Sequence, residues 1–361
     1  MTSSGRDLTI EAVNTTGVVQ FDIASATRGG TRRLMVSDNP ETLNETNFPV
    51  THGVLWHDVV RSHDGQVKHR IFGWHYNVLP NPVKIGITLE NRANHGAVRL
   101  EDVKREYRIG GDEVNWITDI GGTISKAVLA GTMDQRTADQ SLIKQQQSGQ
   151  IESFIVPSGK LFGFVYDFTV KSTDSGEMQY TVRTVASRDT AYDLTLLKSE
   201  PLPLAAQAHP RGNWTFSETN AMTPVYTAGT ERVIYPTAAK LKKDGSIPAD
   251  QLFTAAASEQ PQQSLDNRAQ FGVIYNVTVP VHNPGSQNRT VQISLNPRGG
   301  SYGGAVKIGE DVYGVPLLRT NQQKAPVYVA SVPPGTSTYS FSLMIAGASS
   351  TPLGLLVETL S

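Results

Sequence analysis

Strict alternation of apolar and polar residues in the segment 271–295 constrains the fold more than any other feature of this sequence. Every second residue from Phe271 to Val281 is apolar, and after a turn at 283–285 the same period resumes at Val291, Ile293 and Leu295. Side chains two residues apart share one face of a β-strand. The Asn-Pro-Gly turn ends the first strand. The segment therefore predicts a hairpin-like pair of strands with one buried face.

This pattern recurs earlier in the chain. The segment 85–100 alternates on both sides of a polar turn and corresponds to 277–293. Further on, 155–159 (IVPSG) answers 331–335 (SVPPG), and each opens an alternating strand that is followed by a returning strand, 178–184 in one copy and 353–359 in the other. Any β-sandwich produces alternation and Pro/Gly turns, but four segments that recur in order favour duplication of a domain.

The duplication predicts an all-β protein of two tandem, related β-sandwich domains of jelly-roll type. The first covers 1–198 and the second 215–361, and the stretch 199–214 is the linker because its prolines remove backbone donors. A helical insertion is expected in the first domain near 112–131, where these apolar residues recur at helical spacing: Val114, Ile117, Ile120, Ile124, Ala127 and Val128. Gly121-Gly122 weakens that helix by roughly 1 kcal/mol per glycine relative to alanine, so packing holds it or it breaks there.

Composition excludes several classes of protein. The 361 residues carry a formal net charge of −1 with both signs interspersed, so no nucleic-acid partner is expected. No run approaches the roughly eighteen apolar residues of a membrane span. Cysteine is absent, which excludes disulfides, thiolate nucleophiles and cysteine-bound zinc. We expect no cofactor.

Six of the eight histidines fall between His52 and His95, yet strand geometry argues against a metal site there. A two-residue turn at Asp64-Gly65 predicts a hairpin over 54–77. In it, His69 and His75 share a face about 20 Å apart, whereas ligands of one zinc ion lie within roughly 4 Å of each other. Asp58 and His69 would be diagonal neighbours, either an acid/base dyad or, as the favoured alternative, a cross-strand polar pair.

Surface aromatic and arginine side chains offer the better lead to a function. The glycine-rich loop 298–304 lacks the order of a phosphate-binding loop, and no catalytic motif is present, so no catalytic residue is assigned. Aromatic rings on a sandwich can stack on sugars, although core filling is the competing role. Arginines in connecting loops either contact a ligand or hydrogen-bond carbonyl groups at the junction between the domains. The candidate ligand-binding residues are Trp56, Trp74, His75, Arg211, Trp214, Arg298 and Tyr302.

Several motifs resemble a group of secreted proteins of Gram-positive spore-forming bacteria. They are His75-Tyr76-Asn77 together with segments at 87–91, 162–170, 180–188, 209–214 and 296–306, and the likeness covers roughly 53–361. Some members of that group carry a copper amine oxidase N-terminal-like domain, but that module is missing here, so copper does not carry over. The resemblance implies export and a cell-envelope context, and it implies no known activity. The stretch 1–7 has no apolar signal core, which leaves a mature exported form and a cytoplasmic chain both open.

Together these features predict a non-enzymatic extracellular or cell-surface protein. It would be structural, or it would bind a cell-wall or matrix glycan or another partner, including further copies of itself. The alternative is a hydrolase or lyase that acts on a polysaccharide through carboxylates not identified in the sequence. An enzyme of that kind needs two carboxyl groups about 5 to 10 Å apart in a concave cleft. A binding module needs an aromatic platform or a self-complementary patch.

Overall fold

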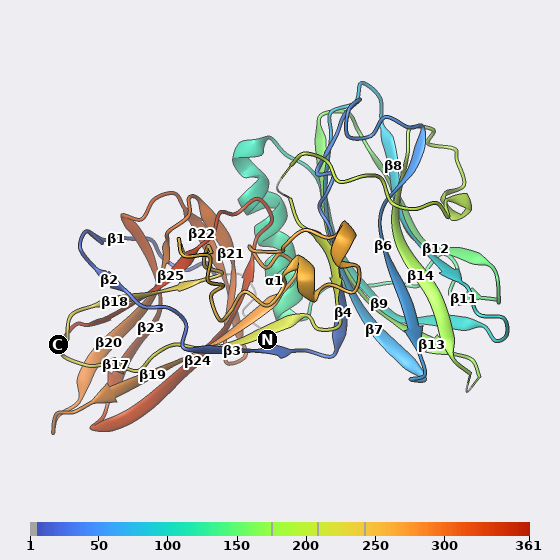
Figure 1. Ribbon diagram of the computed structural model, residues 1–361. Coiled ribbons are helices and arrows are strands. Elements are labelled where there is room, and N and C mark those ends of the chain that lie inside the picture. Colours follow the sequence, from blue (N-terminus) through green and yellow to red (C-terminus); the bar gives the residue numbers. More distant parts are fainter. Residues whose placement is uncertain (1–5, 175, 208, 242) are drawn as a thin grey trace.

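The computed structural model describes residues 6–174, 176–207, 209–241 and 243–361. These residues form four β-sheets arranged as two β-sandwiches, with one short α-helix (Figure 1). The predicted all-β sandwich class is therefore confirmed. Within the described ranges, no helix has both the length and the apolar character needed to cross a bilayer.

The first sandwich is built mainly from the N-terminal half of the chain. One sheet has the order β10 (Asp134–Gln135), β9 (Val98–Gly110), β13 (Lys160–Ser172), β7 (Gln66–Asn77), β4 (Arg32–Ser37) and β15 (Arg211–Trp214), with β11 (Leu142–Ile143) beside β9 and β5 (Thr42–Leu43) beside β7. The facing sheet has the order β12 (Ser148–Val156), β8 (Val83–Asn91), β14 (Met178–Ser187) and β6 (His52–Ser62). A short 3₁₀ helix, η3 (Leu194–Leu196), follows β14 in the chain.

The second sandwich is built mainly from the C-terminal half. One sheet has the order β22 (Asp311–Leu318), β21 (Tyr302–Ile308), β24 (Gly335–Ile345), β19 (Ile274–Asn283), β16 (Glu218–Met222) and β3 (Ser25–Gly29), with β17 (Tyr226–Thr227) beside β19. The other has the order β1 (Glu11–Ala12), β23 (Gln323–Val332), β20 (Arg289–Pro297), β25 (Leu353–Thr359), β18 (Val233–Thr237) and β2 (Val19–Gln20). The short helices η4 (Ala255–Ala257) and η5 (Pro261–Gln263) lie in the long connection before β19.

The two sandwiches share one strand order. β10-β9-β13-β7-β4-β15 matches β22-β21-β24-β19-β16-β3, and β12-β8-β14-β6 matches β23-β20-β25-β18. The match extends to direction, because β4 and β5 run parallel to β7 as β16 and β17 run parallel to β19. This correspondence supports a duplication, while the division into two tandem domains stays a prediction.

The structural match shifts one of the sequence repeats by a strand. The segment 277–293, matched in sequence to 85–100, is equivalent by strand order to β7 and β8 instead. The turns agree in detail, since Asn77 donates to the carbonyls of Asn81 and Val156, and Asn283 donates to those of Gln287 and Val332. By contrast, the matched motifs 155–159 and 331–335 do join equivalent strands.

The predicted hairpins are wrong in their pairing. β6 and β7 lie in different sheets of the first sandwich, and β19 and β20 lie in different sheets of the second. Alternation shows only that one face of a strand is buried. The same alternation arises whether the next strand lies beside it in the same sheet or faces it from the other sheet of the sandwich. Each of these turns therefore carries the chain from one sheet to the facing one.

A two-stranded ribbon crosses from one sandwich to the other. β3 continues into β4 on one side, and β15 continues into β16 on the other. β3 pairs with β16 in the second sandwich, and β4 pairs with β15 in the first. The expected linker 199–214 thus ends in a buried strand, and residues 11–29 of the expected first domain pair with C-terminal strands. The prolines of 199–214 predicted irregular structure. The described residues from 199 to 210 are irregular, whereas 211–214 form β15.

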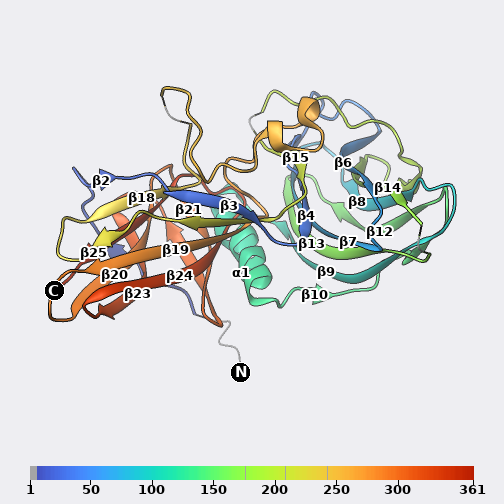
Figure 2. The same cartoon turned by 60° about the horizontal axis from the view of Figure 1, so that its bottom comes forward.

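The expected helix exists in three pieces: η1 (Glu113–Asn115), the π-helix η2 (Trp116–Gly122) and α1 (Thr123–Ala130). The backbone stays helical through Gly121 and Gly122, after which the π-helix passes into α1. The side chain of Val114 lies outside the described residues. The insertion is specific to the first half, since the equivalent β21 and β22 are joined by a tight turn. α1 lies between the sandwiches (Figures 1 and 2).

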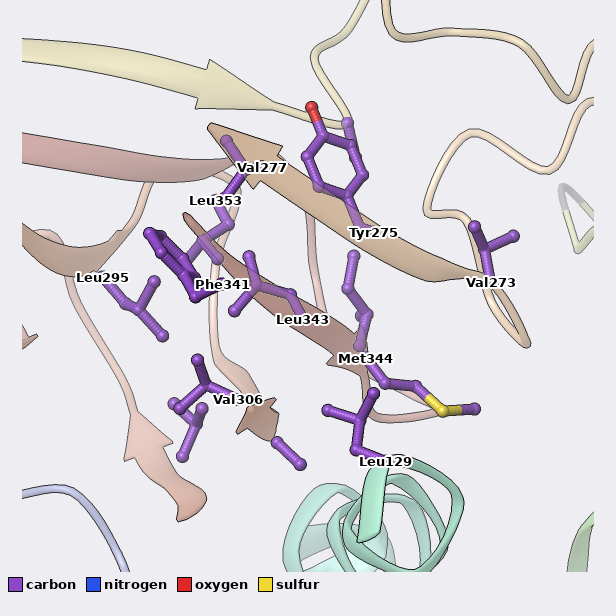
Figure 3. Packing of buried hydrophobic residues seen from close by; sticks show 14 of the residues in the cluster. Leu129, Val273, Tyr275, Val277, Leu295, Val306, Phe341, Leu343, Met344 and Leu353 are labelled. Atoms are coloured by element: carbon purple, nitrogen blue, oxygen red, sulfur yellow. The ribbon is translucent and has the colours of Figure 1, made fainter. Parts of the chain in front are cut away.

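The helix joins a core that reaches both sandwiches. Phe72 and Trp74 of β7 belong to the same buried cluster as Trp116, Phe271 and the interior of the second sandwich. Figure 3 shows Leu129 of α1 near Met344, with the side chains of the second core around them. A separate cluster fills the first sandwich. The junction between the sandwiches is therefore apolar and continuous with the second core.

Candidate functional site at the junction of the sandwiches

Six of the seven predicted ligand-binding side chains lie in the core. Each of these six side chains is at most 2 % exposed. They are Trp56, Trp74, His75, Arg211, Trp214 and Tyr302. All four tryptophans of the chain are buried, so the expected sugar-stacking platform is not formed by them. These side chains fill the core, which was the competing role considered for the aromatic residues in the sequence analysis. In this conformation these six side chains offer no surface to a ligand.

Arg211 hydrogen-bonds carbonyl groups. Its Nη1 donates to the carbonyl of Leu202 at 2.9 Å and its Nε to that of Gln263 at 3.2 Å, while its guanidinium lies 4.5 Å from the ring centroid of Trp56. Burial lowers its pKa to about 10. Arg298 is partly buried and donates to Thr15 Oγ1 at 3.0 Å, which ties an N-terminal segment to the second sandwich. Both arginines thus join segments that are distant in sequence.

Asp58 and His69 meet across the interior of the first sandwich and do not form a dyad. His69 Nδ1 is 3.9 Å from Asp58 Oδ2, and His69 Nε2 pairs with the hydroxyl of Tyr180 at 2.7 Å. Arg33 holds Asp58 with two hydrogen bonds of 3.0 and 2.8 Å. Burial would raise the pKa of Asp58, but the charge of Arg33 lowers it, and burial lowers the pKa of His69 to about 3. The carboxylate is therefore charged and the imidazole neutral at physiological pH.

A cavity of about 410 Å³ lies at the junction of the sandwiches. Its wall combines residues from just before β15, from the connection that leads into β19 and from the β24–β25 loop, among them His209, Pro210, Asp266, Arg268, Phe271 and Thr351. Ligand pockets commonly have this size, lie at such junctions and combine apolar walls with a few polar groups. We take this cavity as the candidate functional site.

The backbone around the cavity is held by side-chain hydrogen bonds. Asp266 accepts from the amide of Ala255 at 2.7 Å and from Arg268 Nε at 3.1 Å. Asn267 accepts from the amide of Phe271 at 2.9 Å, and the ring of Phe271 stacks on that of Phe72 with centroids 5.5 Å apart. Arg268 itself is 54 % exposed along its side chain, so its guanidinium can reach a ligand.

At the edge of the cavity, His209 belongs to a cluster with Asp38 and Glu41. His209 Nδ1 lies 2.9 Å from Glu41 Oε2 and 3.8 Å from Asp38 Oδ2. The neighbouring carboxyl groups of Asp38 and Glu41 raise the pKa of His209 to about 10, and burial raises the pKa of Asp38 well above its usual range. These are the described residues that could hold a metal ion.

The sequence interpretation missed this cluster. Asp38 and Glu41 precede His209 by roughly 170 residues, and only the pairing of β4 with β15 brings them together. The available signal was a carboxylate pair directly after one short strand and a histidine directly before another. Nothing in the spacing along the chain indicates that these two strands are neighbours.

Two other hollows among the described residues are more polar than the junction cavity. One of about 170 Å³ lies over the outer face of the sheet that contains β6 and β14, and its wall includes Glu90, Arg92 and Arg183. Another of about 530 Å³ lies at the β6–β7 turn, with Arg33 and Lys68 in its wall. The residues that line these two hollows include no aromatic side chain, unlike the junction cavity with Phe271.

No family model and no curated protein matches the chain. Among solved structures, the CBM22-1-CBM22-2 tandem domain of Paenibacillus barcinonensis Xyn10C is similar at 10 % identity over 99 % of this chain and 92 % of that chain, with a TM-score of 0.19. The CUB1-EGF-CUB2 domain of human MASP-1/3 is similar at 9 % identity over 84 % of this chain and 99 % of that chain, with a TM-score of 0.18. Likenesses at these scores carry no argument about function.

Proposed function

We propose that this chain is a non-enzymatic binding protein that takes a saccharide into the junction cavity. In keeping with the resemblance of its motifs to secreted proteins, its place is outside the cell or at the cell surface. The observation that carries the proposal is the composition of the cavity wall. A largely buried aromatic ring (Phe271, 8 % exposed), an exposed guanidinium, a carboxylate and an imidazole line a space of about 410 Å³.

This set of groups suits a polyhydroxylated ligand. Sugars present apolar C–H faces and hydroxyl edges, so they combine well with an aromatic ring flanked by polar side chains. Arg268 supplies several donors in a planar arrangement, and Asp266 orients it. Pro210, Leu265 and Ala269 supply apolar surface beside these groups.

The polysaccharide hydrolase or lyase of the alternative hypothesis finds no support in this cavity. Glycoside hydrolysis needs two carboxyl groups that flank the substrate. The lining residues include one carboxylate, Asp266, and both of its oxygens already accept hydrogen bonds. Asp38 lies near the edge, but it is 1 % exposed and cannot reach a sugar. Self-association likewise stays a prediction.

The test is a glycan array of bacterial cell-wall and matrix saccharides, followed by calorimetric titration of the strongest-binding saccharide. We expect Arg268→Ala to weaken binding by at least about tenfold, because a hydrogen bond from a charged donor contributes roughly 1.5 to 3 kcal/mol. Arg92→Ala is the matched control, since Arg92 is exposed in a different hollow and its loss should leave the affinity unchanged. The proposal fails if no saccharide binds, or if both variants bind as the parent does.

A further inference from the structure

Asp38, Glu41 and His209 place three potential ligand atoms within 4.8 Å of one another. Two carboxylates supply oxygen donors, and His209 supplies a nitrogen donor once a cation displaces its ring proton. First-row divalent cations accept this ligand set. Ligand atoms that surround one such ion at about 2 Å lie about 3 to 4 Å apart. A small inward movement of these side chains would therefore bring all three ligand atoms to bonding distance of one ion.

Separate hydrogen bonds to the backbone fix the position of the segments that carry Asp38, Glu41 and His209. The amide of Asp38 donates to the carbonyl of Pro210 at 3.2 Å, which fixes Asp38 beside the segment that carries His209. His75 Nδ1 pairs with the carbonyl of Pro40 at 2.9 Å, and the carbonyl of Glu41 accepts from the amide of Tyr76 at 2.7 Å. Such second-layer contacts preorganise ligands around an ion.

A separate observation points to a missing ligand. Asp38 is 1 % exposed, and its Oδ1 has no hydrogen-bond partner among the described residues. This oxygen belongs to the carboxylate whose Oδ2 faces His209. A buried carboxylate oxygen without a partner is costly, and native proteins satisfy such atoms with a partner, water or an ion.

We propose that Asp38, Glu41 and His209 bind one divalent transition-metal cation of the Zn²⁺ class. Three protein ligands leave a coordination position for water or a ligand, as in open zinc sites. The cation compensates the buried carboxyl group of Asp38 and fixes His209 at the edge of the junction cavity. The inference rests on the cluster alone and does not depend on saccharide binding.

The test is calorimetric titration of ZnCl₂ into the untagged full chain after EDTA treatment and dialysis. We expect one Zn²⁺ per chain and a rise in melting temperature that grows with Zn²⁺ concentration. Glu41→Gln and His209→Gln should each weaken binding by at least about tenfold, since even the loss of a residue that only supports a metal ligand costs about that much.

His63→Gln is the matched control, because His63 also faces a glutamate, Glu177, at 3.4 Å but has an exposed side chain. It should leave the stoichiometric site intact. Absence of stoichiometric Zn²⁺ binding, or equal binding by the parent chain and by the Glu41→Gln and His209→Gln variants, overturns the proposal. Both of these positions are partly exposed, so the test does not depend on replacing the buried Asp38.

Discussion

At the scale of single residues, the interior of the first sandwich is unusually polar. Ser37 Oγ pairs with Thr184 Oγ1 at 2.7 Å and with His75 Nε2 at 3.2 Å, so a hydrogen-bonded group spans the two facing sheets. On the opposite face of the β7 sheet, the face that carries Phe72, Arg70 binds Asp167 with two hydrogen bonds of 2.7 Å. Buried polar groups are tolerated when their partners are present, and the loss of one partner leaves the other uncompensated.

Three buried imidazoles make the stability of the fold sensitive to acid. Burial lowers the pKa of His57 and His75 to about 4 and that of His69 to about 3, against 6.5 in the unfolded chain. Between these values the unfolded state binds more protons, so the free energy of unfolding falls as the pH falls from 6.5 toward 4. We expect each histidine to contribute a loss of about 2 kcal/mol by pH 5, measured by urea unfolding.

The variants His69→Gln and His63→Gln separate this effect from general acid denaturation. His69→Gln removes one buried titrating group, so its free energy of unfolding should fall less steeply with pH. His63 is exposed, and its replacement should keep the slope of the parent chain. Equal slopes for all three proteins would contradict this explanation.

Residue-scale reasoning from the sequence went only part of the way. Alternation indicated correctly which faces are buried, for example at Val277 and Phe341. It could not separate a tryptophan in the core from one on a sugar-binding surface, because the same side chain suits both. The carbonyl contacts of Arg211 were anticipated as an alternative to ligand contact. The partners of His209 lie in the loop that follows β4, and no local pattern indicates that β4 pairs with β15.

At the scale of elements, strand positions were predictable and strand partners were not. Period-two alternation depends on one buried face, and that condition holds for a hairpin and for a turn that crosses to the facing sheet. The helical backbone continues through its two glycines as a π-helix, so packing holds it there, which is one of the two outcomes expected. A Cβ at Gly121 would lie 2.7 Å from both Ala346 Cβ and the amide nitrogen of Gly347, so close packing against the second sandwich requires glycine there.

We therefore expect Gly121→Ala to destabilise the protein despite the higher helix propensity of alanine. The gain in propensity is about 1 kcal/mol, while overpacking against backbone costs about 1 to 3 kcal/mol. Thermal unfolding should show a melting temperature lowered by a few degrees. Gly110→Ala is the control, because a Cβ there meets nothing within 4 Å. An unchanged or raised melting temperature for Gly121→Ala would contradict this packing.

At the scale of the whole molecule, the ribbon and the helix join two similarly ordered sandwiches into one structure. The pairing of β4 with β15 brings His209 beside Asp38, and the apolar junction places Phe271 against Phe72. The candidate site thus depends on contacts between the halves. The sequence repeats indicated that two similar halves exist, but the exchange of strands between them leaves no periodic signal in the chain.

Hydrogen–deuterium exchange with and without the strongest-binding array saccharide tests the junction site most directly. We expect slower exchange in two segments that are distant in sequence, 265–271 and the peptide that contains Thr351, because both line the cavity. The sheet that carries Thr181 and Arg183 on its outer face should be unaffected. Protection confined to that sheet, with no change in 265–271, would contradict a binding site at the junction.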